Sequence, residues 1–561
     1  MKIFRPKIFD VFKGYSASRF ASDAVAGLIV AIIALPLSIA LAIASGVSPE
    51  MGLVTAIVAG FVIALFGGSR VNISGPTAAF ATIVAGVVAT HGLSGLVVAT
   101  LLAGVLLILM GVCRLGALIK YIPMTITVGF TAGIAVTIAV GQIKDFLGLT
   151  YPEGTHAIET GEKLAAVFSS LSTFQLSSLL IGLMGLAILI AWPMLGKIKK
   201  WGKVSTVLGK IPASLIAVVA GILLVQFTPM EVPTIGSLYP DLKAGFPTPS
   251  FPAISLDTVK AVLPSAFTIA ILAAIESLLS CVVSDGMIGD RHNSNTELIA
   301  QGLGNIASGL FGGIPATGAI ARTAANVKNG GRSPISGIIH AAFLMLFLVV
   351  LMPLARLIPM PIIAAILFMV AYNMSEWRHF LHVCRFSGAG DILVMVVTFA
   401  ATVIFDLVVA IALGLVLAAA LFLKKMADTT SVRRWEERED GKPLPHGTVV
   451  YEIQGPMFFA DADKFLDFTL DEDTRTVILR MGGVPTIDAT CMKNLELLLH
   501  TCRMRGVVLL LSHVTDSSQK VLRRANFLEK LGEENLLPTV SAALAIAQMR
   551  AEAEKDAEAA E

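Results

Sequence analysis

The sequence predicts an α-helical polytopic membrane protein of about 14 transmembrane segments, arranged as two inverted halves of seven, followed by a small cytoplasmic α/β domain. The first observation is composition: the 561 residues are 55% hydrophobic and 15% charged, with mean hydropathy +0.80, values typical of a polytopic membrane protein. The second is a series of apolar stretches, most of near-spanning length. The third is the motif Leu-Phe-Gly-Gly, which occurs at 65–68 and again at 310–313.

Charge and cysteine content narrow the class of function. The net charge of +2 gives no basic surface for nucleic acid. The five cysteines, at 113, 281, 384, 491 and 502, have neither metal-ligand spacing nor a disulfide pattern, so we expect them to pack as small apolar residues. The sequence also offers no P-loop and no nucleophile–base pair. We therefore expect a protein that is not an enzyme and binds no cofactor or metal.

The apolar stretches define the expected topology. The first 23 residues are basic and mixed, without a cleavable signal peptide, and form a cytoplasmic N-terminus. A full crossing needs about 20 apolar residues, so several of the later stretches are short. Segments 76–90 and 316–327 follow the two motif copies and bring the count to fourteen. The other predicted spans are 24–45, 52–66, 93–112, 122–140, 177–195, 207–227, 262–283, 296–312, 334–352, 359–372, 391–405 and 406–423.

Loop charges indicate the orientation of these spans. Lys and Arg collect in cytoplasmic loops, and here the basic clusters fall on one side only if both short segments count as spans. Both termini are then cytoplasmic, and Glu50 and Asp406 lie at the outer interface. The basic residues used are Lys2, Arg5, Lys7, Lys13, Arg19, Arg70, Arg114, Lys120, Lys197, Lys199, Lys200, Lys203, Lys210, Arg291, Lys328, Arg332, Arg378, Arg385, Lys424 and Lys425.

The repeated motif indicates an inverted repeat. Aligning its two copies pairs span 52–66 with 296–312 and span 24–45 with 262–283. Paired short segments interrupted by Gly and Pro mark the substrate site in such transporters. The small residues that follow leave two helix N-termini open, and each offers unpaired N–H groups and about half a positive charge. We expect an anion site there; the alternative is a pair of re-entrant packing elements.

Two charged residues lie in apolar surroundings near these segments. Glu276 is inside the span 262–283, where a charge costs about 2.5–3.5 kcal/mol on insertion scales. Its expected partners are protons, a cation or Arg322. Arg322 follows the second predicted helix start, where its charge would add to the helix dipole facing an anion. The alternative for Arg322 is a residue that snorkels to the cytoplasmic interface. His340 is expected to be a packed residue.

Three stretches carry a family resemblance: "PEMGLVTAIVAGFVIALFGGSRVNISGPTA" (49–78), "DGMIGDRHNSNTELIAQGLGNIASGLFGG" (285–313) and "ARTAANVKNGGRSPISG" (321–337). They resemble the SulP family of anion transporters and channels. The resemblance implies a seven-plus-seven inverted repeat of the uracil-permease type. It also implies a core domain that moves against a gate domain, usually within a homodimer in the bacterial inner membrane. The implied anion site is Thr77, Ala78, Gly318, Ala319, Ile320 and Arg322, with Glu276 and Ser280 as coupling residues.

The polar C-terminal part alternates strand-like and helical periods, and three buried β-branched strands predict an α/β domain. It resembles the STAS domain that family members carry, which offers a surface for a cytoplasmic partner. In soluble relatives an Asp precedes a phosphorylatable Ser or Thr. Here the motif is Asp488-Ala489-Thr490, which argues against a phosphorylation switch. The expected domains are 1–23, the membrane domain 24–425 (repeats 24–227 and 262–423), the STAS domain 426–549, and a helical or frayed tail 550–561.

The residues near the expected site bear on the substrate. Many family members have Pro-Gln-Gly-Leu-Ala-Tyr in the first span, whereas this chain has Pro36-Leu37-Ser38-Ile39-Ala40-Leu41. This more apolar wall favours an organic anion, and the pattern is most similar to the C4-dicarboxylate branch. The sodium-coupled bicarbonate branch matches less well, because it has Asp at the position of Glu276 and Thr at that of Ile320.

We therefore expect proton-coupled uptake of a C4-dicarboxylate or sulfate. The alternatives are a sodium-coupled bicarbonate transporter, and an exchanger or channel of the same fold. A channel would need no protonatable carboxylate within the membrane. A membrane enzyme or a STAS-type regulator is a third class of function, and no nucleophile–base pair, P-loop or metal cluster supports an enzyme.

Overall fold

The structure is a computed structural model that describes residues 4–11, 14–117, 123–152, 157, 159–195, 211–242, 245–252, 254–405, 407–460 and 470–558. The predicted basic residues Lys2, Lys13, Lys120, Lys197, Lys199, Lys200, Lys203 and Lys210 and the predicted interface residue Asp406 lie outside these ranges. The chain divides into two compact units, Met1–Leu415 and Val416–Glu561.

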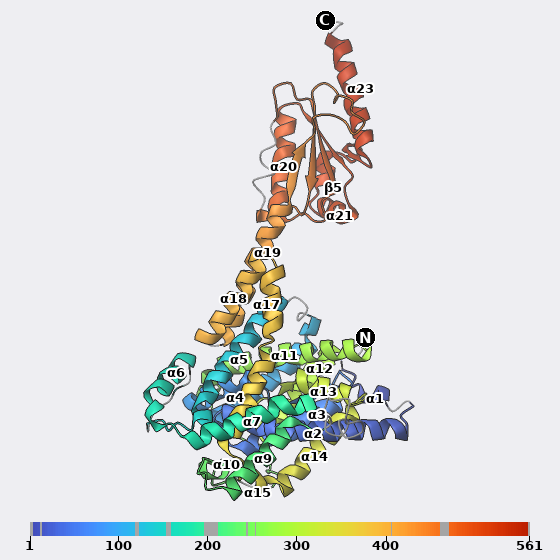
Figure 1. The fold of residues 1–561 in the computed structure, drawn as a ribbon. Helices are drawn as coiled ribbons and strands as arrows, with labels where there is room; N and C mark the ends of the chain where they lie inside the picture. Colours follow the sequence, from blue (N-terminus) through green and yellow to red (C-terminus); the bar gives the residue numbers. More distant parts are fainter. Residues whose placement is uncertain are drawn as a thin grey trace. The chain divides into compact units, whose positions relative to one another are not determined.

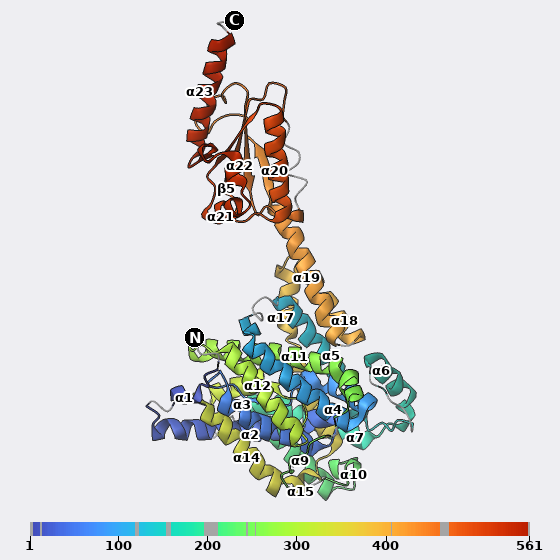
Figure 2. The same cartoon turned by 180° about the vertical axis from the view of Figure 1, so that it is seen from behind.

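The first unit is almost entirely helical (Figure 1, Figure 2). Its elements are α1 (Ile8–Val11), α2 (Ala17–Ala44), α3 (Pro49–Phe66), β1 (Ser74–Gly75), η1 (Ala78–Phe80), α4 (Ala81–Val112), α5 (Met124–Leu147), α6 (Thr160–Ser169), η3 (Leu171–Thr173), α7 (Leu176–Leu195), α9 (Ala213–Phe227), α10 (Ile235–Leu238), α11 (Leu256–Ile288), α12 (Ser294–Leu310), β2 (Thr317–Gly318), α13 (Ile320–Lys328), α14 (Pro334–Val350), α15 (Met352–Ala355), α16 (Met360–Met374), α17 (Trp377–Phe386), α18 (Ala389–Ile404) and α19 (Leu407–Thr429), which continues into the second unit.

Among the described residues, eight helices are long and apolar enough to cross a membrane, and three shorter apolar helices accompany them: Ala213–Phe227, Pro334–Val350 and Ala389–Ile404. The count of fourteen spans stays a prediction. The predicted break between spans 76–90 and 93–112 is confirmed, because the stretch assigned to α4 consists of two helical parts that meet at a kink. Gly92 divides this helix with φ 67° and ψ −174°, a conformation that glycine adopts far more readily than other residues.

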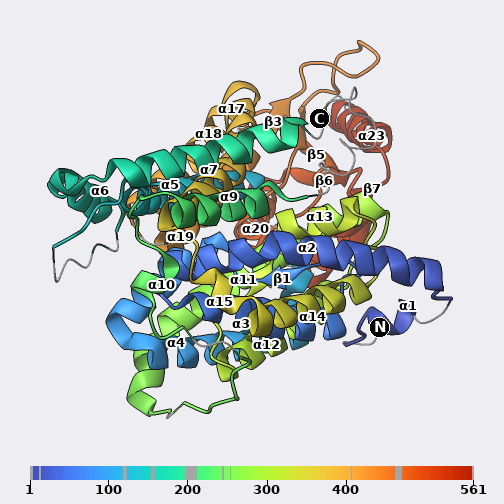
Figure 3. The same cartoon turned by 60° about the horizontal axis from the view of Figure 1, so that its bottom comes forward.

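The helices of the first unit form two bundles. In the first bundle, α4 packs against α11 and α12, while α3 packs against α12 and α14 and α2 packs against α14. In the second, α5 packs against α16 and α18, and α7 packs against α9 and α16. Figure 3 shows α5, α7 and α9 side by side and, separately, α2 beside α14. The packing of α2 against α9 and α16 joins the two bundles.

The second unit is a five-stranded sheet with helices on both faces. Its strand order is β3-β4-β5-β6-β7, with β3 antiparallel to β4 and the other neighbours parallel. Figures 1 and 2 show α20 and α23 on opposite faces of this sheet. The elements are β3 (Ser431–Arg434), β4 (Thr448–Gln454), β5 (Thr476–Gly483), α20 (Ala489–Met504), β6 (Val508–Ser512), α21 (Asp516–Arg524), α22 (Phe527–Leu531), η6 (Glu533–Asn535), β7 (Leu536–Leu537) and α23 (Val540–Glu558).

The sheet of the second unit is buried on both sides. Side chains such as Val477 and Leu479 of β5 pack with Leu495 of α20, whereas Ile478 between them packs with Leu544 of α23. This alternation follows from the two-residue period of a strand. The three buried strands that the sequence predicted are β4, β5 and β6, and the structure adds the short edge strands β3 and β7.

Candidate functional site

The two interrupted segments meet within the first bundle. β1 and β2 pair antiparallel, with Ser74 opposite Gly318 and Gly75 opposite Thr317. The backbone N–H of Ala319 also donates to the carbonyl of Ile73 at 2.9 Å. Segments that follow the two copies of the repeated motif are therefore joined by backbone hydrogen bonds, as two related broken segments in an inverted repeat would be.

A helical segment begins directly after each of these short strands. η1 and α4 start beyond Thr77, and α13 starts beyond Ala319; neither flanking residue caps its helix through a side-chain hydrogen bond. The first N–H groups of a helix lack partners within the helix and carry part of the positive end of its dipole. Two such starts on adjacent strands concentrate partial positive charge at one place, which suits an anion.

Arg322 lies one turn into α13 and is almost fully buried, with 2% of its surface exposed. Its Nη2 donates to the carbonyl of Pro76, just before η1. Its Nε and Nη1 are buried and have no hydrogen-bond partner among the described residues. The side chain therefore does not snorkel to the interface; its charge lies between the two helix starts. Gly75 makes room for it, because a Cβ there would lie 2.7 Å from Arg322 Nη1.

Glu276 lies on α11 beside the first helix start. Thr77 Oγ1 donates to Glu276 Oε2 at 2.9 Å, so one carboxylate oxygen is fixed next to the N-terminus of η1. In the described structure Glu276 and Arg322 form no ion pair with each other. The site thus contains a partly buried acid and a buried arginine.

The next residue of α11 holds the second segment. Ser277 Oγ accepts from the backbone N–H of Gly318 at 2.9 Å and lies 2.7 Å from Thr317 Oγ1. Thr317 Oγ1 also donates to the carbonyl of Ala273 at 3.1 Å. Consecutive residues of α11, Glu276 and Ser277, therefore bind the first and the second segment. A shift of α11 would move both helix starts.

A second acid, Glu297 of α12, is fully buried and holds the segment that precedes β1. Its Oε2 accepts from the backbone N–H groups of Gly68 at 2.9 Å and Ser69 at 3.1 Å. Its Oε1 accepts from Asn72 Nδ2 at 2.8 Å and Gln301 Nε2 at 3.0 Å. Four N–H donors take the place of water around this fully buried carboxylate, which is how a protein retains a buried charge.

Asn72 extends this network to the helix that carries Arg322. Its Oδ1 accepts from Ser280 Oγ at 2.7 Å and from Thr323 Oγ1 at 3.0 Å. Thr323 Oγ1 in turn accepts from the backbone N–H of Ile73 at 2.9 Å. Ser280, the second expected coupling residue, thus hydrogen bonds to Asn72 and Thr323. Glu297 was not predicted as a site residue, although it is a lone acid in the stretch "NTELIAQGLGN".

The expected anion-site residues occupy different environments. Ala78 and Gly318 are buried, and Thr77 and Ala319 are partly buried. Ile320 is 40% exposed, so its side chain leaves the protein interior at the first position of α13. Only its backbone lies at the helix start. Outside this group, His340 of α14 is packed in the interior, with 1% of its surface exposed.

Comparison with known proteins identifies related chains. The profile of the sulfate permease family matches residues 20–398, and that of the STAS domain matches residues 442–543. The Bacillus subtilis protein YvdB, provisionally named a sulfate transporter, is 38% identical over 93% of this chain and 97% of its own. The bicarbonate transporter BicA of a Picosynechococcus strain is 31% identical over 84% of this chain and 85% of its own.

A solved structure has the same fold. The structure of SLC26A9 superposes with a TM-score of 0.87, covering 98% of this chain and 93% of the other, at 18% sequence identity. At this identity the likeness concerns the fold alone: a helical membrane domain joined to a STAS domain.

Proposed function

The chain belongs to the sulfate permease family of anion transporters, and we propose that it is a secondary active transporter that takes up a small anion together with protons. The observation that carries the proposal is the pairing of β1 with β2, which brings two uncapped helix starts and Arg322 together. A channel needs no buried acid beside its anion site, whereas a coupled carrier needs a group that loads and releases the second ion. Glu276 supplies such a group.

The anion would bind at the two helix starts. Backbone N–H groups after Thr77 and Ala319 would donate to it, and the unpartnered nitrogens of Arg322 would supply the balancing charge. Burying an unpaired guanidinium is costly, so a bound anion would stabilise Arg322 as well as being held by it. The residues proposed for binding are Thr77, Ala78, Gly318, Ala319, Ile320 (through its backbone) and Arg322.

For the substrate we propose a C4-dicarboxylate, such as succinate or fumarate, or sulfate. The apolar segment from Leu37 to Leu41 favours an anion with a carbon skeleton. Similarity to YvdB supports sulfate, because that relative is named for sulfate transport. Similarity to BicA supports bicarbonate as the second candidate. These three anions differ in charge, size and hydrogen-bonding geometry, so one uptake panel separates them.

Proton coupling follows from the cost of moving charge. Bringing a dianion into a negative-inside cell costs about 4.6 kcal/mol per 100 mV, twice the roughly 2.3 kcal/mol for one charge. Uptake without net charge movement therefore needs two accompanying cations, or one for a monoanion. A carboxyl in an apolar environment favours its neutral form. Protonated Glu276 would let the loaded bundle move without carrying a bare carboxylate.

Transport in reconstituted vesicles tests this function. Proteoliposomes with an acidic outside should accumulate one of labelled succinate, fumarate, sulfate or bicarbonate against its gradient, in a saturable manner and without sodium. The Glu276→Gln variant should keep substrate binding and exchange but lose accumulation driven by the pH gradient. Glu231→Gln, an exposed acid before α10, is the control and should transport normally.

Three outcomes would contradict the proposal. Non-saturable flux, with anion accumulation that never exceeds the level set by the anion's own electrochemical gradient, would indicate a channel. Bicarbonate uptake that requires sodium would indicate the second candidate. Undiminished pH-driven accumulation by Glu276→Gln would show that another residue is the coupling group.

We further propose that the protein forms a homodimer in a bacterial inner membrane, with both termini cytoplasmic and the STAS domain free to bind a cytoplasmic partner.

A further inference from the structure

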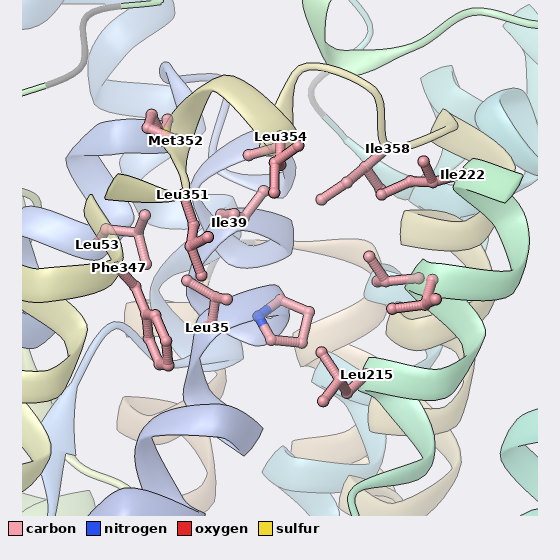
Figure 4. Close-up of a pocket in the computed structure, with 14 residues that line it drawn as sticks. Leu35, Ile39, Leu53, Leu215, Ile222, Phe347, Leu351, Met352, Leu354 and Ile358 are labelled. Carbon is pink, nitrogen blue, oxygen red and sulfur yellow. The ribbon is translucent and has the colours of Figure 1, made fainter. Parts of the chain in front are cut away.

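An apolar cavity of about 220 Å³ lies at the seam between the two helix bundles, and no residue of β1 or β2 lines it (Figure 4). Leu35 and Ile39 of α2 and Phe347 of α14 line it from the first bundle. Leu215 and Ile222 of α9 line it from the second. Figure 4 shows these side chains pointing toward one another across the space. The cavity therefore lies where α2 and α14 of the first bundle face α9 of the second.

Its lining contains no polar side chain. All fourteen lining residues are Ala, Ile, Leu, Met, Phe, Pro or Val, and the ring nitrogen of Pro36 carries no hydrogen to donate. Water in a protein cavity is held by two to four polar partners, and an apolar cavity without them stays dry or takes an apolar ligand. An anion is excluded as well, because the lining offers it no hydrogen-bond donor and no positive charge. The natural occupant is a hydrocarbon chain.

The edge of the cavity lies at the outer surface of the membrane domain. Val219 and Leu354, both lining residues, are 45% and 54% exposed. Apolar side chains that are half exposed on the outside of membrane-spanning helices lie against lipid. Beside the lining residues Ala355 and Ile358, Arg356 is also exposed and anchors one guanidinium nitrogen on the carbonyl of Leu242. Its charge lies at the end of α15, where it complements a lipid phosphate.

From this combination we propose that the seam binds one acyl chain of a membrane phospholipid, whose phosphate lies at Arg356. The chain occupies the space between α2, α9 and α14, and the cation fixes the headgroup end. The lining residue Ile39 also belongs to the apolar segment Leu37–Leu41, but the cavity includes neither helix start and none of the residues proposed to bind the anion. Lipid binding there is therefore tested separately from transport.

Photolabelling of the full-length protein tests this site. The protein is reconstituted in nanodiscs that contain a phosphatidylcholine with a diazirine in the middle of one acyl chain, irradiated, and mapped by mass spectrometry. Residues 215–222 and 347–358 should be labelled several-fold more than the exposed lipid-facing residues of α7. Val219→Trp, which fills the edge of the cavity, should remove the excess. Leu223→Trp is the control: it is also half exposed on α9 but does not line the cavity.

Two further variants guard against misfolding. Ala355→Leu also reduces the cavity volume with a smaller change, and Arg356→Gln removes only the cation. Each variant is accepted only if it elutes as a single species and binds substrate anion like the wild type. Ala355→Leu should lower the labelling, and Arg356→Gln should lower it by weakening retention of the headgroup. Equal labelling of all lipid-facing helices, or labelling that Val219→Trp and Ala355→Leu leave unchanged, would overturn the proposal. Labelling that disappears when two copies are crosslinked would assign the cavity to a second copy and would also overturn it.

Discussion

Arg322 illustrates how much depends on single buried charges in this molecule. Its guanidinium offers five N–H donors, yet the described structure gives it one carbonyl, that of Pro76, and leaves Nε and Nη1 buried without partners. A side chain in this state destabilises the fold unless another group completes its surroundings. The two helix starts beside it add further positive potential. A negatively charged ligand would pair with the guanidinium nitrogens and with the helix starts, in agreement with the proposed anion site.

Replacing Arg322 with Ala should weaken anion binding about 10- to 100-fold, because a hydrogen bond to a charged group contributes about 1.5–3 kcal/mol and about 1.4 kcal/mol corresponds to a factor of ten. Arg322→Lys should retain part of the affinity, because it keeps the charge but loses the fork of donors. Titration of purified protein with the transported anion measures both effects. Lys328→Ala, at the exposed end of the same helix, is the control. Equal affinity in wild type and Arg322→Ala would restrict the site to the backbone N–H groups.

Glu297 has a structural role that a substitution can isolate. Glu297→Gln places an NH₂ group where one oxygen now accepts N–H donors, so at least one buried donor loses its acceptor. We expect a loss of stability of about 1–3 kcal/mol. Thermal unfolding in detergent should show a lower midpoint than for Asp391→Asn, which changes an exposed acid. An unchanged midpoint would mean that the four hydrogen bonds contribute nothing net.

Some of these buried charged and polar residues could be predicted from the sequence and others could not, and the difference has a physical reason. Glu276 and Arg322 were visible because a charge is costly among apolar neighbours, whatever its exact contacts. The role of Glu297 depends on Gly68, Ser69 and Asn72, which precede it by more than two hundred positions, and no local pattern joins them. The partners of Ser280 were missed for the same reason: they come from the segment before β1 and from α13 rather than from its own helix.

Among the elements, the turn after α3 shows how the repeated motif determines the site. The carbonyl of Gly68 accepts from the backbone N–H of Asn293 at 3.0 Å, so the turn lies directly on the start of α12. A Cβ on Gly68 would fall 2.1 Å from Asn293 O, a distance that the backbone cannot accommodate without moving. The second glycine of the first motif copy is thus required by close packing between the two repeats.

Gly68→Ala should therefore reduce stability by about 1–3 kcal/mol or prevent folding, since overpacking a close contact shifts the backbone. Gly86→Ala in α4 is the matched control, because its Cβ would meet nothing within 4 Å. Yield of monodisperse protein and its unfolding midpoint distinguish the two. Similar yields and unfolding midpoints of both variants would show that the turn tolerates a Cβ at Gly68. The repeated glycine would then not be required for packing.

Periodicity and hydropathy located most helices but not every helix start. They correctly placed a break near residue 92, where the non-helical conformation of Gly92 divides α4 into two helical parts. They also began the first span at 24, while the helix starts at Ala17 because Ser16 caps it by accepting from the N–H of Arg19. Hydropathy detects only the apolar part of a membrane helix, so it does not detect a polar first turn such as the one that contains Arg19.

For the whole molecule, the division into two units separates the anion site from the STAS domain. β1, β2, α11, α12 and α13 all belong to Met1–Leu415, and every hydrogen bond described at the site is formed within it. The second unit has its own sheet and its own two buried clusters. Asp488 caps α20 by accepting from the N–H of Cys491, and the next residue, Ala489, has no hydroxyl group that could be phosphorylated. Control of transport by phosphorylation at that position is therefore not expected.

Truncation after Lys425 should leave substrate binding intact, because both repeats and the β1–β2 pair are complete before that point. We expect an affinity within about twofold of the full-length value, together with a changed transport rate or oligomeric state. The free energy of a twofold change is only about 0.4 kcal/mol, well below the cost of losing one contact at the site. Isothermal titration, paired with light scattering for oligomeric state, measures both quantities. Arg322→Ala in the truncated background should weaken binding as much as in the full chain. A well-folded truncated protein that no longer binds the anion would show that the STAS domain helps to form the site.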